Sequence, residues 1–326
     1  DEPLSTPALE SRVDIRRTPL ELLLKVLDVD GSVRRVKGGW VSTGQPWTYD
    51  EERYERIAES RRAEQQSMLA YERGEGCRME LLQRELDDPT AAPCGRCDVC
   101  AGPWYPVDAT PEAVAAASGA LDRVGVPIEP RGQWPTGAGR LGVEVDGKPV
   151  SGKISADERP GTGRVVARLT DLGWGGVLRE LFAAGAPDAP VSDDLLGGCV
   201  RVLSDWDWAA RPVGVVAMPS AARPQLVGSV AEGIARLGRL PVLGQLELAD
   251  GAPADTAGGN SAYRLAGVWG RFLVGPDLAA ALSQADGPVL LVDDLVDSRW
   301  TMTVAARELR LHGADSVLPF ALAAVA

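Results

Sequence analysis

Four of the five cysteines lie close together in the sequence, in a pattern suited to holding a metal ion. Sixteen residues separate Cys77 from Cys94, and two residues separate each of the next pairs, which end at Cys97 and Cys100. Two residues between thiolates let both sulfurs reach one tetrahedral centre, and Gly95 relieves crowding in that turn. Four sulfur ligands leave no open coordination position, so we expect one structural zinc ion that performs no catalysis.

Other uses of clustered cysteines stay open at this point. The thiols can instead be buried or disulfide-bonded, and an iron–sulfur cluster is a further alternative. Zinc is favoured because four clustered thiols in an otherwise cysteine-poor chain have few other uses. Residues 78–86 have the pattern of an amphipathic helix, which places Cys77 at a helix N-terminus, where a thiolate is favoured. Cys199, the fifth cysteine, is expected to be an ordinary buried thiol.

A second string with chemical potential runs from Val289 to Thr301, where four aliphatic residues lead into Asp293 and Asp294. The pattern predicts a buried strand, then a tight loop and a helix whose amides can hold a phosphate. The two acids can hold ribose hydroxyls, directly or through Mg²⁺. The simpler alternative is a strand end with solvated acids.

A nucleoside-triphosphatase interpretation of the paired acids requires a phosphate-binding loop, which the sequence lacks. The nearest string, Gly142–Lys148, is followed by Pro149 where Ser or Thr must bind Mg²⁺. Its alternating Val and acidic residues predict a hairpin instead. We therefore expect that this chain does not hydrolyse ATP.

Basic side chains gather on a predicted hairpin, formed by strands at 32–36 and 39–42. A hairpin with basic flanks and an aromatic tip can pair with phosphates and stack on a base at a junction of single-stranded and duplex DNA. The alternative is that the aromatic ring belongs to the core and the basic residues form a solvated face. The predicted DNA-binding residues are Arg34, Arg35, Lys37 and Trp40.

The remaining pattern divides the chain into modules. A short helix at 20–27 precedes the hairpin and a polar helix follows from Tyr49 to about Arg73, which is typical of a winged-helix module. In the last third, continuous aliphatic runs alternate with helical segments, which indicates an α/β domain with a mostly parallel sheet. We predict a multidomain chain: a lead-in at 1–16, an α+β winged-helix-like module at 17–73, a zinc module at 74–106, an intermediate module at 107–189 and an α/β domain at 190–326.

Composition narrows the function classes. The net charge of -12 argues against a protein that coats DNA uniformly, but it permits a local basic patch. The sequence has no apolar run long enough to span a membrane and no signal peptide, and clustered thiols suit a reducing compartment, so we expect a cytoplasmic protein without a membrane partner. Because the sequence starts at Asp1 without Met, we expect a fragment of a longer protein.

The residues around the cysteines resemble the zinc-binding subdomain of RecQ-family DNA helicases. The similarity covers Gln65–Tyr71, Cys77–Leu82 and Pro93–Cys100, and the cysteine spacing matches that family at every gap. The resemblance implies a parent enzyme that unwinds DNA in the 3′ to 5′ direction, works in DNA repair and recombination, and associates with the nucleoid. It also implies that the ATPase motor, which is absent here, is a partner of this chain.

The predicted order of modules departs from ordinary RecQ proteins, which place the zinc module before the winged helix. It resembles divergent actinobacterial RecQ-like helicases, which also end in a phosphoribosyltransferase-like domain. Consistent with this, Val289–Thr301 resembles the type I phosphoribosyltransferase signature that binds the 5′-phosphate of phosphoribosyl pyrophosphate. Met218–Arg223 resembles the pyrophosphate loop of that family, and Asn260–Arg264 followed by Phe272 resembles its competence-protein branch.

The resemblance implies a ligand set with Mg²⁺, made of Asp293, Asp294, Ser298, Arg299, Thr301, Ser220 and Arg223. The family loop commonly reads Thr-Thr-Gly-x-Thr, but here Arg299 replaces the glycine and Asp297 adds a carboxylate, which Arg299 can offset. We therefore expect binding of a phosphorylated ribose without transferase turnover and no catalytic residue in this chain. The alternatives are an active phosphoribosyltransferase of nucleotide metabolism with an accessory zinc module, and a protein-interaction module.

Overall fold

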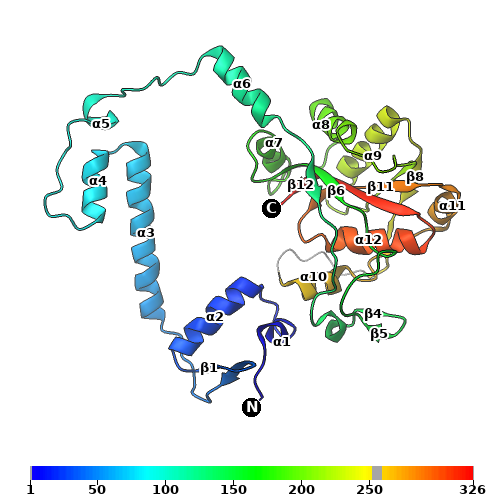
Figure 1. Cartoon of the computed structure of the whole chain (residues 1–326), viewed down its shortest axis with the longest axis horizontal. Helices are drawn as coiled ribbons and strands as arrows, with labels where there is room; N and C mark the ends of the chain where they lie inside the picture. Colours follow the sequence, from blue (N-terminus) through cyan, green and yellow to red (C-terminus); the bar gives the residue numbers. More distant parts are fainter. Residues whose placement is uncertain (1, 252–258, 326) are drawn as a thin grey trace. The chain divides into compact units, whose positions relative to one another are not determined.

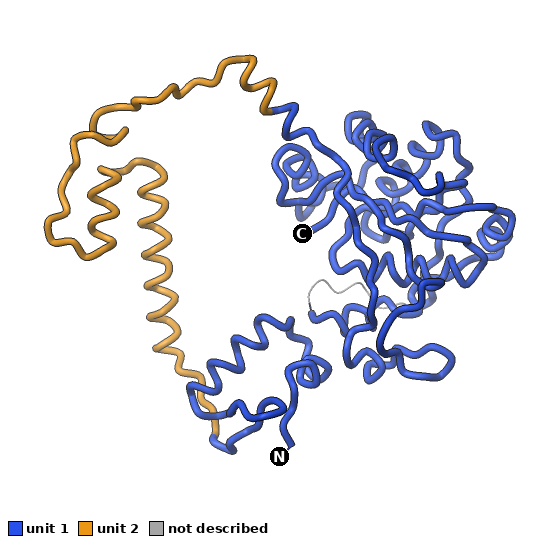
Figure 2. The backbone as a smooth tube through the Cα atoms, viewed as in Figure 1, with its two compact units in different colours: residues 1–45, 118–326 blue, residues 46–117 orange. Residues whose placement is uncertain are grey.

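The computed structural model describes residues 2–251 and 259–325. The chain divides into two compact units (Figure 2): unit 1 comprises residues 1–45 and 118–326, and unit 2 comprises residues 46–117. Within the described residues, no helix has the length and apolar character needed to cross a membrane.

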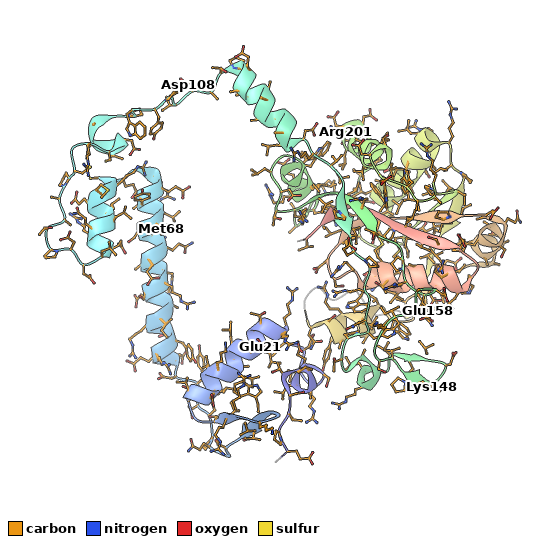
Figure 3. All side chains as sticks on the ribbon, viewed as in Figure 1. Glu21, Met68, Asp108, Lys148, Glu158 and Arg201 are labelled. Atoms are coloured by element: carbon orange, nitrogen blue, oxygen red, sulfur yellow. The ribbon has the colours of Figure 1, made fainter. Side chains whose placement is uncertain are left out.

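Unit 2 is built on the long helix α3 (Glu51–Arg73). The Asp50 carboxylate caps its first turn by accepting from the Arg53 N–H at 3.0 Å, and Gly74 ends it in a left-handed conformation. None of the side chains of α3 is buried, and Met68, labelled in Figure 3, is 68% exposed. The other helices are α4 (Arg78–Glu85), α5 (Asp98–Ala101) and α6 (Pro111–Leu121), whose end reaches into unit 1.

The N-terminal part of unit 1, residues 2–45, combines two helices with a β-hairpin, and we call it the helical hairpin module. Its elements are α1 (Thr6–Glu10), α2 (Arg17–Val29), β1 (Val33–Val36) and β2 (Gly39–Ser42). The strands pair antiparallel, and Leu20 and Leu24 of α2 pack against Trp40 of β2. The predicted hairpin is confirmed.

The rest of unit 1 is an α/β module around one six-stranded sheet. The strand order is β3-β6-β12-β11-β7-β8, with β3 antiparallel to β6 and the other neighbours parallel. The mostly parallel sheet predicted from the aliphatic runs is therefore present. The strands are β3 (Val126–Ile128), β6 (Gly163–Arg168), β7 (Gly214–Ala217), β8 (Val242–Gln245), β11 (Pro288–Val296) and β12 (Ser316–Ala324).

Helices cover both faces of this sheet (Figure 1). Along β11, Val289 and Leu291 enter one core while Leu290 and Val292 enter the other, which explains the continuous aliphatic run. One face carries α10 (Ser261–Val268), α11 (Pro276–Gln284) and α12 (Trp300–Leu311). The other face carries α7 (Trp174–Leu181), α8 (Asp193–Ser204) and α9 (Pro224–Gly238).

Short elements complete unit 1. They are the 3₁₀ helix η1 (Ala138–Leu141) and the strands β4 (Glu144–Val145), β5 (Lys148–Pro149), β9 (Glu247–Leu248) and β10 (Phe272–Leu273). Strands β4 and β5 pair antiparallel and Lys148 is exposed on this hairpin (Figure 3), so the string that most nearly matches a phosphate-binding loop is a hairpin, as predicted.

The compact units do not follow the predicted module boundaries. Helix α3, expected in the module at 17–73, belongs to the unit that holds the cysteines. The predicted module at 107–189 is divided between the units at residue 118, and its later part shares the sheet of the α/β domain, because β6 pairs with β12, with Val165 beside Ala321. These pairings join residues more than 150 positions apart, so local patterns carry no signal of them.

Candidate metal centre and polar pocket

The four clustered cysteines come together in unit 2. The sulfur atoms of Cys77, Cys94, Cys97 and Cys100 all lie within 4.8 Å of one another, and all five cysteines of the chain are free. Cys77 precedes α4 and Cys97 precedes α5, so two helix starts present their sulfurs to one point. Gly95 takes a left-handed conformation (φ 67°) in the turn between Cys94 and Cys97.

Backbone amides bond to the sulfurs. The N–H of Cys94 donates to Cys77 Sγ at 3.2 Å, and the N–H of Cys97 donates to Cys94 Sγ at 3.3 Å. The amide of Cys94, helped by that of Glu80, lowers the pKa of Cys77 to about 6. The amide of Gly95 favours the Cys100 thiolate, but sharing protons with Cys97 and Cys77 outweighs it and raises the pKa of Cys100 to about 12.

This donor set fits a zinc ion. Tetrahedral zinc with Zn–S bonds of about 2.3 Å separates its sulfurs by about 3.8 Å, and Cys97 Sγ lies 4.0 Å from Cys77 Sγ. A disulfide needs about 2.05 Å and is excluded at this distance. Four sulfurs this close cannot all lose their protons without repelling one another, as the raised pKa of Cys100 indicates. A bound cation removes that repulsion, so the cluster favours one. The cluster can therefore bind one metal ion such as zinc.

The remaining cysteine behaves as predicted. Cys199 is fully buried on α8, and burial raises the pKa of its thiol to about 12. A thiol that stays protonated at neutral pH is a poor nucleophile and a poor metal ligand. Cys199 is therefore an inert part of the core beneath the sheet.

The predicted DNA-binding residues separate into two groups. Arg34, Arg35 and Lys37 are exposed on the β1–β2 hairpin. Trp40 is only 9% exposed, and its ring packs in the core of the helical hairpin module while the Arg35 guanidinium lies 5.8 Å from the ring centroid. Trp40 therefore packs in the core of this module, as the core alternative had it, and its predicted contact with DNA stays a prediction.

A polar pocket of about 540 Å³ opens at the carboxyl ends of β7 and β11. The chain leaves β7 toward β8 on one side and β11 toward β12 on the other, so the pocket lies where the strand order reverses. Open α/β sheets bind ligands at this kind of switch point. Its polar lining includes Ser220, Arg223, Arg264, Arg271, Asp293, Asp294, Asp297, Ser298 and Thr301.

Six of the seven predicted phosphoribosyl-ligand residues line this pocket, and Arg299 does not. Arg299 takes a left-handed conformation (φ 70°), which glycine adopts most readily, and its Nη1 donates to the Glu129 carbonyl at 3.0 Å. Its side chain lines a separate, smaller cavity instead. Asp297 also lines that cavity, so the expectation that Arg299 offsets its charge stays a prediction.

Two arginines that the sequence reasoning did not assign to the pocket hold its loop, Asp297–Thr301. Arg264 of α10 forms an ion pair with Asp297. Arg131 donates from Nε and Nη2 to the Ser298 carbonyl at 3.0 and 2.7 Å and lies over the Trp300 ring. Burial, reinforced by Arg299 and Arg264, lowers the pKa of Arg131 to about 10. The Asn260–Arg264 string was the available signal for the first of these arginines.

The paired acids lie near the carboxyl end of the central strand β11. Asp293 is 8% exposed, and its Oδ1 accepts from the Asp294 N–H at 2.9 Å. Burial raises the pKa of Asp294, although the Leu295 amide and the Arg223 guanidinium act against this. Acids held in this way can accept from hydroxyl groups or coordinate a divalent cation.

The start of helix α9 is already occupied by the chain itself. The Asp188 carboxylate accepts from the N–H groups of Gln225 and Leu226 at 2.9 and 3.1 Å. A helix N-terminus is a common anion site, but these two donors have an internal partner. An anion in the pocket must therefore rely on the arginine side chains and on other amides.

Comparison with models of known protein families and with curated proteins gives no match for this sequence.

Proposed function

We propose that this chain is a DNA-engaging part of a RecQ-like 3′–5′ ATP-dependent DNA helicase, separate from its ATPase motor. The observation that carries the proposal is the cysteine cluster, whose spacing resembles the RecQ zinc module and whose sulfurs lie within 4.8 Å of one another. The zinc is structural. The helical hairpin module acts as the winged helix, and the α/β module has the phosphoribosyltransferase fold.

DNA contact is assigned to the exposed edge of the β1–β2 hairpin. Arg34 and Arg35 on β1 and Lys37 in the turn project three positive charges from a module whose core holds the hairpin rigid. Phosphate contacts of this kind set affinity and salt dependence without reading sequence. A local basic edge also reconciles DNA binding with the net charge of -12.

The test is binding of a forked DNA to the zinc-loaded chain and to the triple variant Arg34→Ala, Arg35→Ala, Lys37→Ala. We expect the variant to bind at least tenfold more weakly at low salt. The slope of the logarithm of its binding constant against the logarithm of salt concentration should also be shallower, by about 0.9 per lost phosphate contact. The matched control removes three exposed arginines of the α/β module, Arg123, Arg211 and Arg236. Equal loss in both variants, or no binding by the unmodified chain, would rule out the hairpin as the contact.

We assign the pocket of the α/β module to a phosphorylated ribose, bound with Mg²⁺ at Asp293 and Asp294. Its place at the switch point and its mixture of acids, hydroxyls and arginines support this assignment. We propose binding without transfer, because Asp188 fills the start of α9 and Arg299 turns away from the pocket.

Calorimetry with phosphoribosyl pyrophosphate and Mg²⁺ tests this assignment. We expect saturable binding that is lost in Asp293→Asn and retained in Asp286→Asn, which alters an exposed acid at the opposite end of β11. Release of pyrophosphate in the presence of nucleobases would instead support an active phosphoribosyltransferase. Absence of binding would remove the assignment.

A further inference from the structure

The segment between α1 and α2 lies against the start of α10, although the two are about 250 positions apart. Asn260 Nδ2 donates to the carbonyl oxygens of Glu10 at 2.6 Å and of Val13 at 2.8 Å. Its backbone N–H donates to Asp14 Oδ1 at 2.8 Å. Asn260 is 5% exposed, so these bonds are shielded from water.

The same side chain also begins helix α10. Asn260 Oδ1 accepts from the N–H groups of Ala262 and Tyr263 at 3.0 and 3.3 Å. The oxygen of the amide therefore caps the helix while its nitrogen holds the N-terminal segment. A buried amide with every group bonded favours a single arrangement of the elements that it joins.

Glycines allow the two parts to approach closely. Gly259 has φ +72°, and a Cβ atom there would lie 2.4 Å from Asp14 Oδ1. Gly137, with φ +88°, approaches Ser11 so closely that a Cβ would lie 2.1 Å from the Ser11 Cβ. Arg140 Nη1 adds a bond of 3.1 Å to Ser11 Oγ. The close approach of the N-terminal segment to the α/β module therefore depends on glycine at both positions.

Helix α10 continues from this contact to the polar pocket. One turn after Asn260, Arg264 forms its ion pair with Asp297. Ser261 Oγ accepts from Trp300 Nε1 at 2.8 Å. Both partners belong to the pocket loop, Asp297–Thr301. The position of Asn260 therefore determines where Arg264 and Ser261 contact that loop.

We propose that Asn260 is a positioning residue for the pocket: docking of residues 10–14 fixes the start of α10, which places Arg264 and the pocket loop for an anionic ligand. The proposal rests on the proposed function in that it takes the pocket to bind a phosphorylated ribose. By reciprocity, a ligand that engages Arg264 strengthens docking of the helical hairpin module, which carries the proposed DNA-binding residues.

The alternative is a plain contact between two modules with no effect on the pocket. Two variants distinguish the positioning role from the plain contact. Asn260→Ser keeps an oxygen that can cap α10 but removes both donors to Glu10 and Val13. Asp14→Asn keeps an acceptor for the Asn260 N–H and serves as the conservative partner. Ser192→Ala, which removes the cap of α8, controls for loss of a helix cap elsewhere in the module.

Hydrogen exchange of the full chain measures the linkage without a ligand. We expect Asn260→Ser to speed amide exchange at residues 5–16 and also at 297–301, by about fivefold or more at the loop, which is the low end of usual coupling. Asp14→Asn and Ser192→Ala should leave the loop unchanged. Faster exchange at 5–16 alone would overturn the proposal, as would unchanged exchange at both segments.

Calorimetry supplies the second measurement. With phosphoribosyl pyrophosphate and Mg²⁺ as the probe, we expect Asn260→Ser to raise Kd about tenfold, within the usual range of coupling, and Asp14→Asn to keep the unmodified value. An unchanged Kd in Asn260→Ser would overturn the proposal. If the unmodified chain does not bind the probe, the proposed pocket function fails, while the exchange measurement still decides whether the docked segment and the loop are linked.

Discussion

Arg78 and Asp98 form a two-bond ion pair beside the cysteine cluster, with Arg78 Nε 2.7 Å from Asp98 Oδ1 and Nη2 2.8 Å from Oδ2. Arg78 follows Cys77 and Asp98 follows Cys97, so the pair ties together the two helix starts that supply sulfurs. Arg78 also donates to the Tyr71 carbonyl and lies over the Tyr71 ring, which joins α4 to α3. The pair lowers the pKa of Asp98, because the guanidinium favours its carboxylate form.

The first prediction concerns this ion pair. Arg78→Lys keeps the charge but loses the planar two-bond geometry, so the sulfurs are held less firmly. We expect zinc to pass to a chromogenic chelator about tenfold faster than from the unmodified chain, in line with other groups that orient metal ligands. Arg84→Lys, on the same helix, alters an exposed pair with Glu80 and should leave the rate unchanged. Equal rates for both variants would count against a supporting role for Arg78.

The second prediction concerns metal removal. Helices α3, α4 and α5 contain no buried residue, so little apolar packing remains to hold unit 2 once the sulfurs are released. We expect a chelator to abolish slow amide exchange at residues 74–101 and to leave that of the sheet strands β7, β11 and β12 unchanged. Protected amides at 74–101 after complete zinc removal would show that the fold of unit 2 does not need the metal.

The third prediction concerns Trp40. Because its ring packs on Leu20 and Leu24, Trp40→Ala should destabilise the helical hairpin module by about 3 kcal/mol or more, through lost burial and the cavity left behind. Hydrogen exchange at residues 17–42 measures this loss. Trp104→Ala, at a ring that is 82% exposed, should change exchange little. A stable Trp40→Ala variant that loses DNA binding would instead make Trp40 a direct contact.

The fourth prediction concerns pH. Burial raises the pKa of Asp294 above its ordinary value of 3.8, so the folded chain holds this proton more tightly than the unfolded chain. The free energy of unfolding therefore falls as pH rises from about 3.8 through the raised pKa. We expect Asp294→Asn to melt at a higher temperature than the unmodified chain at pH 7.

The difference between the two proteins should shrink as pH falls below 3.8, because Asp294 then becomes mostly protonated in both states. Asp286→Asn, at an exposed acid, is the control and should show no such trend. A difference in melting temperature that does not change with pH would mean that burial of the Asp294 charge is not its cause.

The sequence by itself determined the local elements. The zinc spacing from Cys77 to Cys100, the β1–β2 hairpin and the aliphatic strand β11 all follow from short-range patterns, and each is present in the structure. Such features depend on residues that lie close together in the sequence. Six of the seven predicted phosphoribosyl-ligand residues also line one pocket, since the carboxyl ends of parallel strands and the loops after them meet at one end of the sheet.

Only the tertiary structure decided which distant groups meet. Trp40 lies in the core because α2 packs against the hairpin, and Arg264 of α10 pairs with Asp297 although the two are distant in the sequence. The bonds from Asn260 to the segment at 10–14 likewise join parts that no local pattern relates. The physical reason is the same in each case: side-chain partners are chosen by the packing of whole helices against the sheet, and that packing is set by burial summed over the entire chain.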